Sequence, residues 1–235
     1  MVSRCKYRES GNALFLILIA VALFGALTYA VSSSTRSGST GGGRQEDNEV
    51  IASSLLQYAS GMAMTVERMR LSNGCSESNI SFETPLMSYD HTHSPPVLDK
   101  CKVFHPSGGG YTYQENLNWY NAASYNTGFK SWATFITGDY NIVDVGTDAS
   151  DLIMFIFPLT LDVCNKINEK LGVTYPGTTP PFSSGGDSDP FQGTYATSAD
   201  NMADEPGSVY AGHSAACTYG SIGTHYALYY TLLER

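Results

Sequence analysis

The pattern of apolar residues divides the chain into three stretches. Residues 13–31 carry no charged side chain and no polar stripe, and a helix of this length, at about 1.5 Å per residue, spans roughly 28 Å, close to the hydrocarbon thickness of a bilayer. Residues 32–45 are rich in serine and glycine, which predicts a flexible linker. From Glu46 to Arg70, apolar side chains recur every three or four residues, which predicts an amphipathic helix that ends at Asn73-Gly74.

The rest of the chain has the short alternating or apolar runs of strands. One further helix is predicted from the N-cap Thr160 to Leu171, with Gly172 as its stop. Apolar residues show little periodicity over residues 173–208, which predicts a long surface loop. Predicted strands cover residues 79–83, 102–105, 131–136, 140–145, 151–157 and 226–233. The predicted fold class is α+β: an N-terminal transmembrane helix, a glycine-rich break, and an amphipathic helix packed on an antiparallel sheet with one small helix.

Charge adds an orientation to this layout. Arg4, Lys6 and Arg8 precede the apolar run, so the positive-inside rule leaves the N-terminus in the cytoplasm and exports the rest. The chain as a whole has a net charge of −9, which argues against a nucleic-acid partner. The expected organisation is a leader over 1–11, a membrane helix over 12–31, a linker over 32–45 and an exported head over 46–235.

Three kinds of export signal fit the N-terminus. The helix could be an uncleaved anchor, or a signal peptide removed after Thr28-Tyr29-Ala30. The third interpretation rests on Arg8-Glu9-Ser10-Gly11-Asn12, where a short basic leader ends in glycine and the apolar helix begins at once. This arrangement resembles the class III signal of type IV pilins and of the pseudopilins of type II secretion.

The resemblance implies a maturation route and a function. A leader peptidase in the membrane would cut between Gly11 and Asn12, and the retained helix would pack in a filament core. Its fifth mature residue would be Leu16, where major pilins carry glutamate. The residues expected in that assembly helix include Leu14, Leu16, Val21 and Phe24. The implied partners are further copies of the chain or other pilin-like subunits, first in the inner membrane and then in a periplasmic or cell-surface filament.

The cysteines fit an exported head. Cys5 lies in the leader, and four cysteines remain in the head: Cys75, Cys101, Cys164 and Cys217. An even number in an oxidising compartment predicts two disulfides, with three pairings open. Cys75–Cys101 with Cys164–Cys217 is favoured because each pair is local to one half of the head. No two cysteines have the close spacing of zinc ligands, so no metal is expected.

The candidate catalytic and metal-binding motifs are weak. Gly212-His213-Ser214-Ala215-Ala216 approaches a nucleophile elbow but ends in alanine, so a small-residue turn is favoured. His91 and His93 could ligate a metal, but their Ser/Pro-rich surroundings favour a solvated loop. Several acids of the 173–208 region could ligate calcium, although they match no EF-hand spacing: Asp187, Asp189, Asp200, Asp204 and Glu205.

An aromatic cluster is the remaining candidate surface. Its members are Tyr111, Tyr113, Trp119, Tyr120 and Tyr125. If exposed, they could stack on sugars or a partner protein, although such residues more often line a sheet. The sequence therefore favours a structural filament subunit without enzymatic activity or cofactor. The alternatives are a membrane-anchored binding module or adhesin that uses these aromatics, and a secreted hydrolase that uses Ser214 or the His91/His93 pair.

Overall fold

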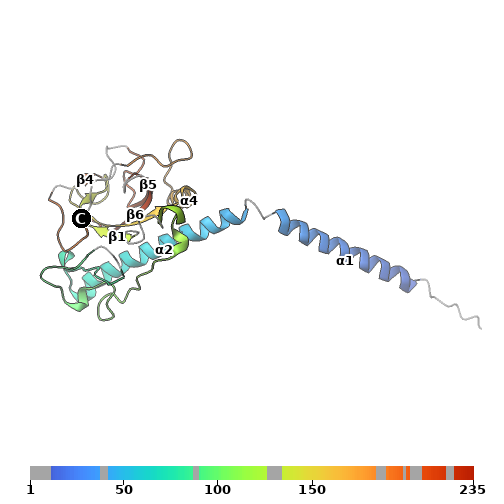
Figure 1. Ribbon diagram of the computed structural model, residues 1–235, viewed down its shortest axis with the longest axis horizontal. Coiled ribbons are helices and arrows are strands. Elements are labelled where there is room, and N and C mark those ends of the chain that lie inside the picture. Colours follow the sequence, from blue (N-terminus) through green and yellow to red (C-terminus); the bar gives the residue numbers. More distant parts are fainter. Residues whose placement is uncertain are drawn as a thin grey trace, which may run out of the picture. The chain divides into compact units, whose positions relative to one another are not determined.

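The computed structural model describes residues 12–37, 42–86, 90–125, 134–183, 189–197, 200–201, 208–220 and 225–235. They belong to two compact units, Met1–Asp47 and Asn48–Arg235, and Figure 1 shows the elements of each. Helix α1 covers Asn12–Ser37 and helix α2 covers Gly42–Asn73. None of the helices in the described residues is both long and apolar enough to cross a membrane. The spanning role of residues 13–31 stays a prediction.

Helix extends into the range predicted as a linker. α1 continues to Ser37, and α2 begins at Gly42, so residues 32–37 and 42–45 are helical rather than irregular. Residues 38–41 lie outside the described residues. The physical reason is that each residue added to an existing helix gains a hydrogen bond, while serine loses only a few tenths of a kcal/mol and glycine about 1 kcal/mol relative to alanine.

Helix α2 packs one face into the core of the second unit. The buried side chains recur every three or four residues and are 0–4% exposed: Ala52, Leu55, Tyr58, Ala59, Met62, Val66 and Met69. Burying a leucine or methionine stabilises a fold by about 1.5–3 kcal/mol. The helix is therefore held chiefly by this face. It stops before Gly74, whose positive φ of 63° glycine adopts without strain.

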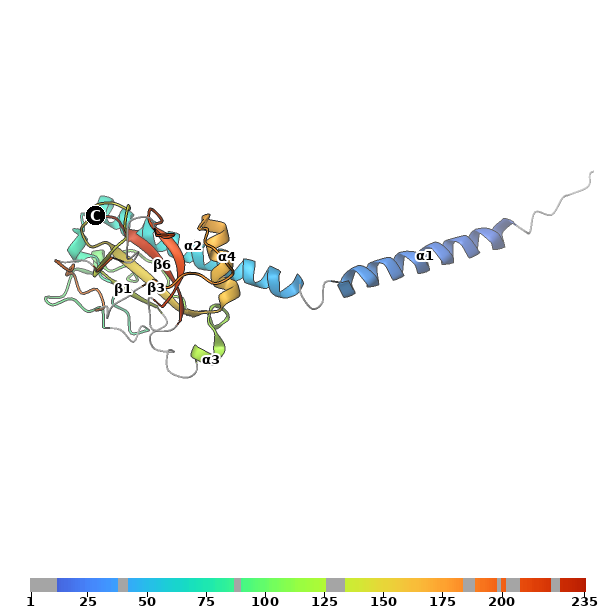
Figure 2. The same cartoon turned by 90° about the horizontal axis from the view of Figure 1, so that it is seen from above.

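A four-stranded antiparallel sheet lies beside α2 in both views (Figures 1 and 2). Its order is β1-β3-β6-β5, formed by Thr134–Thr137, Leu152–Leu159, Tyr226–Leu233 and Ala215–Tyr219. Alternate residues of β3 face opposite sides. Leu152 and Met154 join the core that contains α2 and α4, and Ile153 and Phe155 join a second core with Tyr210 and Val173. Both faces of the central strand are thus covered, as its fully buried pattern requires.

Three predicted elements match the structure closely. β6 occupies the predicted range 226–233, and β3, Leu152–Leu159, begins one residue and ends two residues later than the predicted 151–157. Helix α4 spans Leu161–Leu171. The Thr160 side chain accepts a hydrogen bond from the N–H of Val163, and Gly172 has a φ of 73°. Both caps are therefore the ones that the sequence predicts.

The predicted strand 131–136 corresponds in its described part to β1, whereas three other predicted strands are wrong. The ranges 79–83 and 102–105 form only an isolated bridge between Ser81 and Lys102, and 140–145 does not pair with β1. Instead β2, Tyr140–Asn141, pairs in parallel with β4, Asp200–Asn201, inside the predicted loop. A turn follows at once, since Val145 N–H donates to Ile142 O at 3.0 Å. Short helical turns complete the described chain: η1 Glu77–Asn79, η2 Asp99–Cys101, η3 Leu117–Trp119 and α3 Ala122–Ser124.

The sequence predicts a small-residue turn over Gly212–Ala216, but its last two residues begin strand β5. It pairs along its length with β6, with Ala216 opposite Tyr229 and Cys217 opposite Leu228. Its alanines are buried, so their small size reflects close packing beneath larger neighbours rather than a turn. Local composition cannot separate these two situations because both favour small residues.

Candidate functional site

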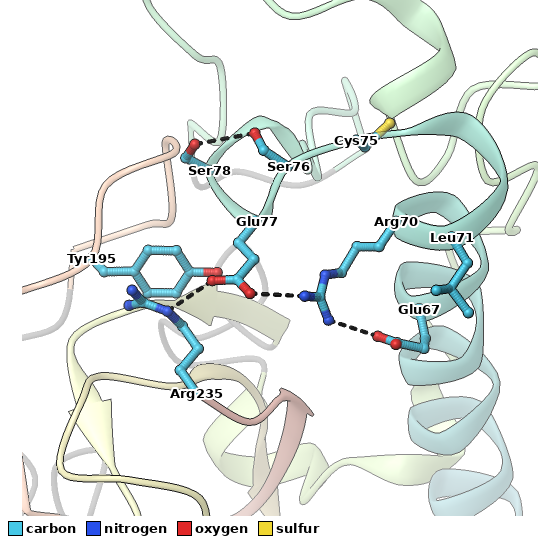
Figure 3. A pocket seen from close by; sticks show the side chains of 9 residues that line it. All are labelled: Glu67, Arg70, Leu71, Cys75, Ser76, Glu77, Ser78, Tyr195 and Arg235. Atoms are coloured by element: carbon cyan, nitrogen blue, oxygen red, sulfur yellow. Dashed lines mark hydrogen bonds and ion pairs between the residues drawn. The ribbon is translucent and has the colours of Figure 1, made fainter.

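A polar pocket of about 540 Å³ lies between the end of α2, the turn η1 and the last residue of the chain. Figure 3 shows the charged side chains converging on its floor. The lining comes from three segments that are distant in sequence: Glu67, Arg70, Leu71, Cys75, Ser76, Glu77, Ser78, Tyr195 and Arg235. The pocket is therefore a product of tertiary folding.

Glu77 joins two arginines at the centre of this pocket. Its Oε1 lies 2.8 Å from Arg70 Nη2, and its Oε2 lies 3.0 Å from Arg235 Nε (Figure 3). Arg70 Nη1 also pairs with Glu67 Oε2 at 2.9 Å. The four charges cancel. Since the paired side chains are 28–49% exposed, solvent screening limits each pair to about 0.2–1 kcal/mol.

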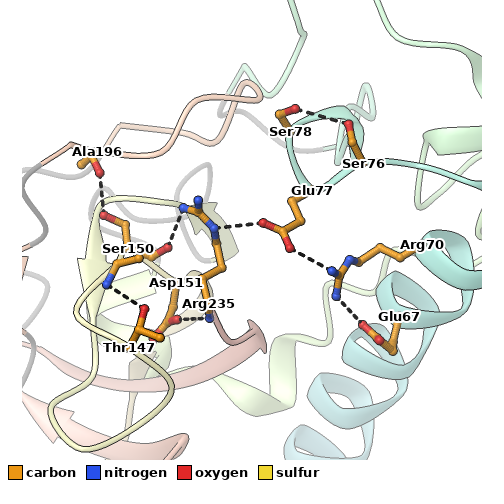
Figure 4. Close-up of polar contacts among 11 residues, drawn as sticks. Glu67, Arg70, Ser76, Glu77, Ser78, Thr147, Ser150, Asp151, Ala196 and Arg235 are labelled. Carbon is orange, nitrogen blue, oxygen red and sulfur yellow. Dashed lines mark hydrogen bonds and ion pairs between the residues drawn. The ribbon is translucent and has the colours of Figure 1, made fainter.

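Arg235 is fixed by more than its ion pair. Its guanidinium carbon lies 3.9 Å from the centre of the Tyr195 ring, a cation–π geometry. Nη1 donates to Ser150 O at 3.1 Å, and the backbone N–H donates to Asp151 Oδ1 at 2.8 Å (Figure 4). The N–H of Thr147 donates to Arg235 O. These contacts orient the guanidinium toward Glu77.

Asp151 is the buried acid behind this network. Its residue is 0% exposed, and burial raises the pKa of its carboxyl to about 6, although backbone hydrogen bonds from Arg235 and Ile142 oppose the shift. Its Oδ2 has no hydrogen-bond partner among the described residues. The carboxyl therefore changes charge near neutral pH.

The pocket has the chemistry of a binding site or a clamp. Its lining includes two guanidinium groups and two serine hydroxyls, and Cys75 is held in a disulfide. Burial raises the pKa of Tyr195, so this hydroxyl stays a donor. Because Glu67 and Glu77 also line the pocket and pair with both guanidinium groups, the lining offers hydrogen-bond donors and acceptors without net positive charge. Sequence reasoning missed it because the only local signal was the i,i+7 spacing of Arg70 and Glu77.

A second pocket, of about 560 Å³, contains one of the predicted calcium ligands. Asp189 lies on its wall with Asp139, whose Oδ2 accepts hydrogen bonds from Thr137 Oγ1 at 2.7 Å and Asp189 N–H at 2.8 Å. Asp200 belongs to β4, while the other three acids, Asp187, Asp204 and Glu205, lie outside the described residues. Within the described ranges, no group of three or more metal-ligating side chains is present.

The two histidines are buried rather than solvated, which corrects the predicted loop. His91 and His93 are 1% and 4% exposed, and His91 Nδ1 lies 3.1 Å from Phe191 O. Burial lowers the pKa of His91 to about 4. Ser214 is exposed just before β5, and no hydrogen bond joins its side chain to a histidine in the described part of the chain.

The aromatic residues do not form an exposed platform, which corrects the prediction of ligand-facing side chains. Trp119 and Tyr120 are 2% and 5% exposed, and Tyr111 and Tyr113 pack partly buried against the same core. Trp119 and Tyr111 contact α2, whereas the hydroxyl of Tyr120 lies 3.4 Å from that of Thr134 in β1, beside the sheet as the sequence favours.

α2 offers these aromatics polar partners as well as an apolar face. Trp119 Nε1 donates to Ser54 Oγ at 2.9 Å, and Tyr111 Oη donates to Tyr58 O at 2.6 Å. A Cβ at Gly61 would lie 2.7 Å from Tyr111 Oη, so the missing side chain makes room for this contact. Buried tyrosine and tryptophan need such partners, which explains their position.

Both disulfides of the structure have the pairing favoured from the sequence. Cys75 is joined to Cys101 and Cys164 to Cys217. The first follows the end of α2, and the second ties α4 to β5. Cys5 lies outside the described residues. Two disulfides in a domain of this size are typical of an oxidising, extracytoplasmic compartment.

The predicted processing and assembly residues lie in and before α1. Gly11 is outside the described residues, and Asn12 and Leu14 belong to the first turn of the helix. Leu16, Val21 and Phe24 are 59%, 66% and 70% exposed. These apolar side chains are therefore uncovered in the single chain.

The fold and the disulfides together define a disulfide-bonded α+β head preceded by a helix with exposed apolar side chains. No protein-family model, no curated protein and no solved structure matches the chain. Any function must therefore be argued from the residues and their geometry.

Proposed function

We propose that this chain is a structural subunit of a pilus-like or pseudopilus-like envelope filament that assembles through α1. The observation that carries the proposal is the exposure of apolar side chains around the whole helix. Successive residues Phe15, Leu16, Ile17 and Leu18 are 59–63% exposed, and four consecutive positions cover every side of a helix. A helix of this kind is stable only in lipid or against other apolar surfaces.

The proposed assembly has an adequate driving force. At about 25 cal/mol per Å² of apolar surface, a helix of this size gains tens of kcal/mol gross on leaving water. Exposed ion pairs on the head contribute about 1 kcal/mol or less each. The contacts of the α1 helices would therefore dominate assembly, while the head would set spacing and surface properties.

The proposed route has a membrane stage before the filament. The chain would enter the inner membrane with its N-terminus in the cytoplasm, and the leader would be removed between Gly11 and Asn12. The head would fold and form its disulfides outside the cytoplasm. The paired cysteines and the basic residues before α1 both support this order.

The test is the mass of the mature N-terminus, combined with electron microscopy of the assemblies. We expect a chain that begins at Asn12 and forms filaments. Gly11→Leu should block leader removal, while the matched change Gly25→Leu, at a position with nothing within 4 Å of a Cβ, should leave removal unaffected. A mature chain that begins at Val31 has lost the assembling helix and refutes the proposal.

One observation favours a second function, an anchored binding module. The pocket holds the guanidinium groups of Arg70 and Arg235, which share Glu77 as an ion-pair partner, and a carboxylate ligand would bind them by displacing Glu77. Titration calorimetry with small dicarboxylates tests it: binding that Arg235→Gln abolishes, in a protein that never forms filaments, favours the module over the filament subunit.

A further inference from the structure

Helix α2 has an exposed apolar line opposite its buried face. Val50, Met64 and Leu71 are 68%, 74% and 78% exposed. They lie at multiples of seven residues, and the exposed Gln57 fills the remaining position. Residues spaced by sevens lie along one line of a helix, and a helix-packing seam combines two such lines, offset by three and four residues. We call Val50, Gln57, Met64 and Leu71 the outer seam.

The second line of this seam holds Ser53, Ser60 and Glu67, of which Glu67 is charged and pairs with Arg70 at 2.9 Å. Ser53 and Ser60 are small, and both are partly exposed. Their hydroxyls donate to backbone oxygens of their own helix, Ser53 to Glu49 O at 2.8 Å and Ser60 to Gln57 O at 3.2 Å. Covering these serines leaves no hydroxyl donor unpaired, so the desolvation penalty is small.

We propose that the outer seam packs against the outer seam of a second copy, parallel to it and displaced by two heptads. This inference rests on the proposed filament function and specifies a contact between heads. A displacement of two heptads equals about 21 Å along the helix axis, at 1.5 Å per residue. It places Val50 of one copy against Met64 of the other, and Gln57 against Leu71.

Charge complementarity selects this displacement. Glu49, beside Val50, has a side chain that is 58% exposed. In a parallel helix pair, residues that flank the seam at this position meet residues five positions later in the partner. In a pair without displacement, Glu49 of one copy lies opposite Ser54 of the other. In the pair displaced by two heptads, Glu49 lies opposite Arg68 of the other copy, which is an exposed cation. In the single chain Glu49 pairs with Lys170 at 3.1 Å, and Arg68 Nη2 donates to Gly109 O, so the proposed pair would replace these two contacts.

The displaced contact also has the symmetry that a filament requires. Each copy uses the N-terminal half of its seam toward one neighbour and the C-terminal half toward another. Such a head-to-tail contact does not close on itself, so its repetition gives an open assembly. An in-register pair would instead give a closed dimer.

Cysteine cross-linking in assemblies of the full chain tests the contact. The double variant Val50→Cys/Met64→Cys should form, under mild oxidation, a ladder of chains longer than a dimer. The matched pair Val50→Cys/Leu71→Cys should cross-link at least tenfold less. Dimers from Val50→Cys alone would overturn the displacement, because only in-register packing brings these two residues together.

A charge exchange provides the second measurement. Glu49→Arg should reduce the Val50→Cys/Met64→Cys cross-link several-fold, and adding Arg68→Glu should restore it. Two outcomes would refute the outer-seam contact but not the filament itself. In the first, filaments form normally but show no cross-link above the control pair. In the second, filaments of Met64→Asp form at undiminished density. Absence of filaments from the unmodified chain refutes the proposed function, so the two failures are distinguishable.

Discussion

The two long helices of this chain place their apolar side chains in opposite situations. In α1, Leu16, Val21 and Phe24 are all more than half exposed, whereas in α2 the residues Leu55, Met62 and Val66 are 0% exposed. The sheet and the loops of the head cover one side of α2, so that helix needs no second molecule to fold. The apolar surface of α1 requires an environment that the single chain does not provide. The contrast assigns folding to α2 and, if the proposed filament forms, the main assembly contact to α1.

A Val→Asp substitution should lower the stability of the head when it is made in α2, and should prevent assembly or membrane insertion when it is made in α1. The largest effect is expected in α2. Val66→Asp buries a carboxylate among apolar side chains, and we expect it to destabilise the head by at least about 4 kcal/mol. Tryptophan fluorescence during urea unfolding measures this, because both tryptophans lie in the head. The control is Val50→Asp on the exposed side of α2, which should leave the unfolding midpoint unchanged.

Removing a disulfide should weaken only the head, by a similar amount. The Cys164–Cys217 bridge closes a loop with a sequence separation of 53, against 26 for Cys75–Cys101. The chain-entropy relation then assigns about 4 kcal/mol to the first and about 3.5 kcal/mol to the second. Paired Cys→Ala variants, compared by urea unfolding, should show this order. Membrane fractionation should show no change, since α1 contains no cysteine.

Val21→Asp should have the reverse phenotype to Val66→Asp. A charge near the middle of an apolar helix costs about 3 kcal/mol in lipid, and each subunit of a filament would carry this penalty. We expect loss of filaments or of membrane insertion, scored by electron microscopy and fractionation, with an unchanged midpoint for unfolding of the head. A variant that still assembles normally would contradict the role of α1.

Acid should affect the head alone, because α1 contains no histidine or acid. The pKa of His91 is lowered from 6.5 to about 4, so its contribution to stability is present above pH 6.5 and is lost as pH falls through about 4. That of Asp151 is raised from 3.8 to about 6, so its contribution is present below pH 3.8 and is lost as pH rises through about 6. Each shift corresponds to about 3 kcal/mol.

These two effects oppose each other between pH 4 and 6, so single variants should separate them. His91→Gln should make the head relatively more stable toward pH 4, and Asp151→Asn should make it relatively less stable there. Urea unfolding at pH 4.5 and pH 6.5 gives the change in the free energy of unfolding between these two pH values for each protein. An equal change in both variants and in the unmodified chain would show that neither buried side chain contributes to the pH dependence of stability.

The smallest effect on the stability of the head is expected for a change in the connection between α1 and α2. Inserting two glycines between Ser37 and Gly42 lengthens the chain where the sequence predicts a break. The entropy of a flexible connection rises slowly with length, by about 0.6 kcal/mol for a doubling. We expect the unfolding midpoint of the head to stay within error. A measurable loss of head stability would show that the two helices support each other.

Sequence reasoning succeeded where the determinants are local. Thr160 and Gly172 cap α4 by contacts within a few residues, and the apolar run of β3 has the strand length that the sequence indicates. The pairing of β2 with β4 joins residues 140–141 to 200–201, and no local pattern encodes such a contact. The burial of His91 likewise depends on Phe191, a hundred residues away.

The pocket was unpredictable for the same reason. Arg70 and Glu77 are close in sequence, but Arg235 reaches them only because β6 runs beside β3 and ends near Asp151. A charged residue at the end of a strand has no distinguishing sequence signal. The aromatic cluster is easily recognised in the sequence, but the sequence does not show whether it is exposed or buried. Trp119 is equally suited to a ligand-binding surface and to a buried position beside α2.

The position of the Cys75–Cys101 bridge has a mechanical consequence. In a filament under tension, force would enter the head through α2, and the bridge begins two residues after that helix ends. At about 3.4 Å per residue, the two disulfides prevent roughly 90 Å and 180 Å of chain from extending under force. In a stretched subunit α2 and the connecting segments could unfold, but the segments closed by the disulfides could not be extended. The subunit would therefore stop well short of its full contour length, and the closed segments would help it to refold when the force is removed.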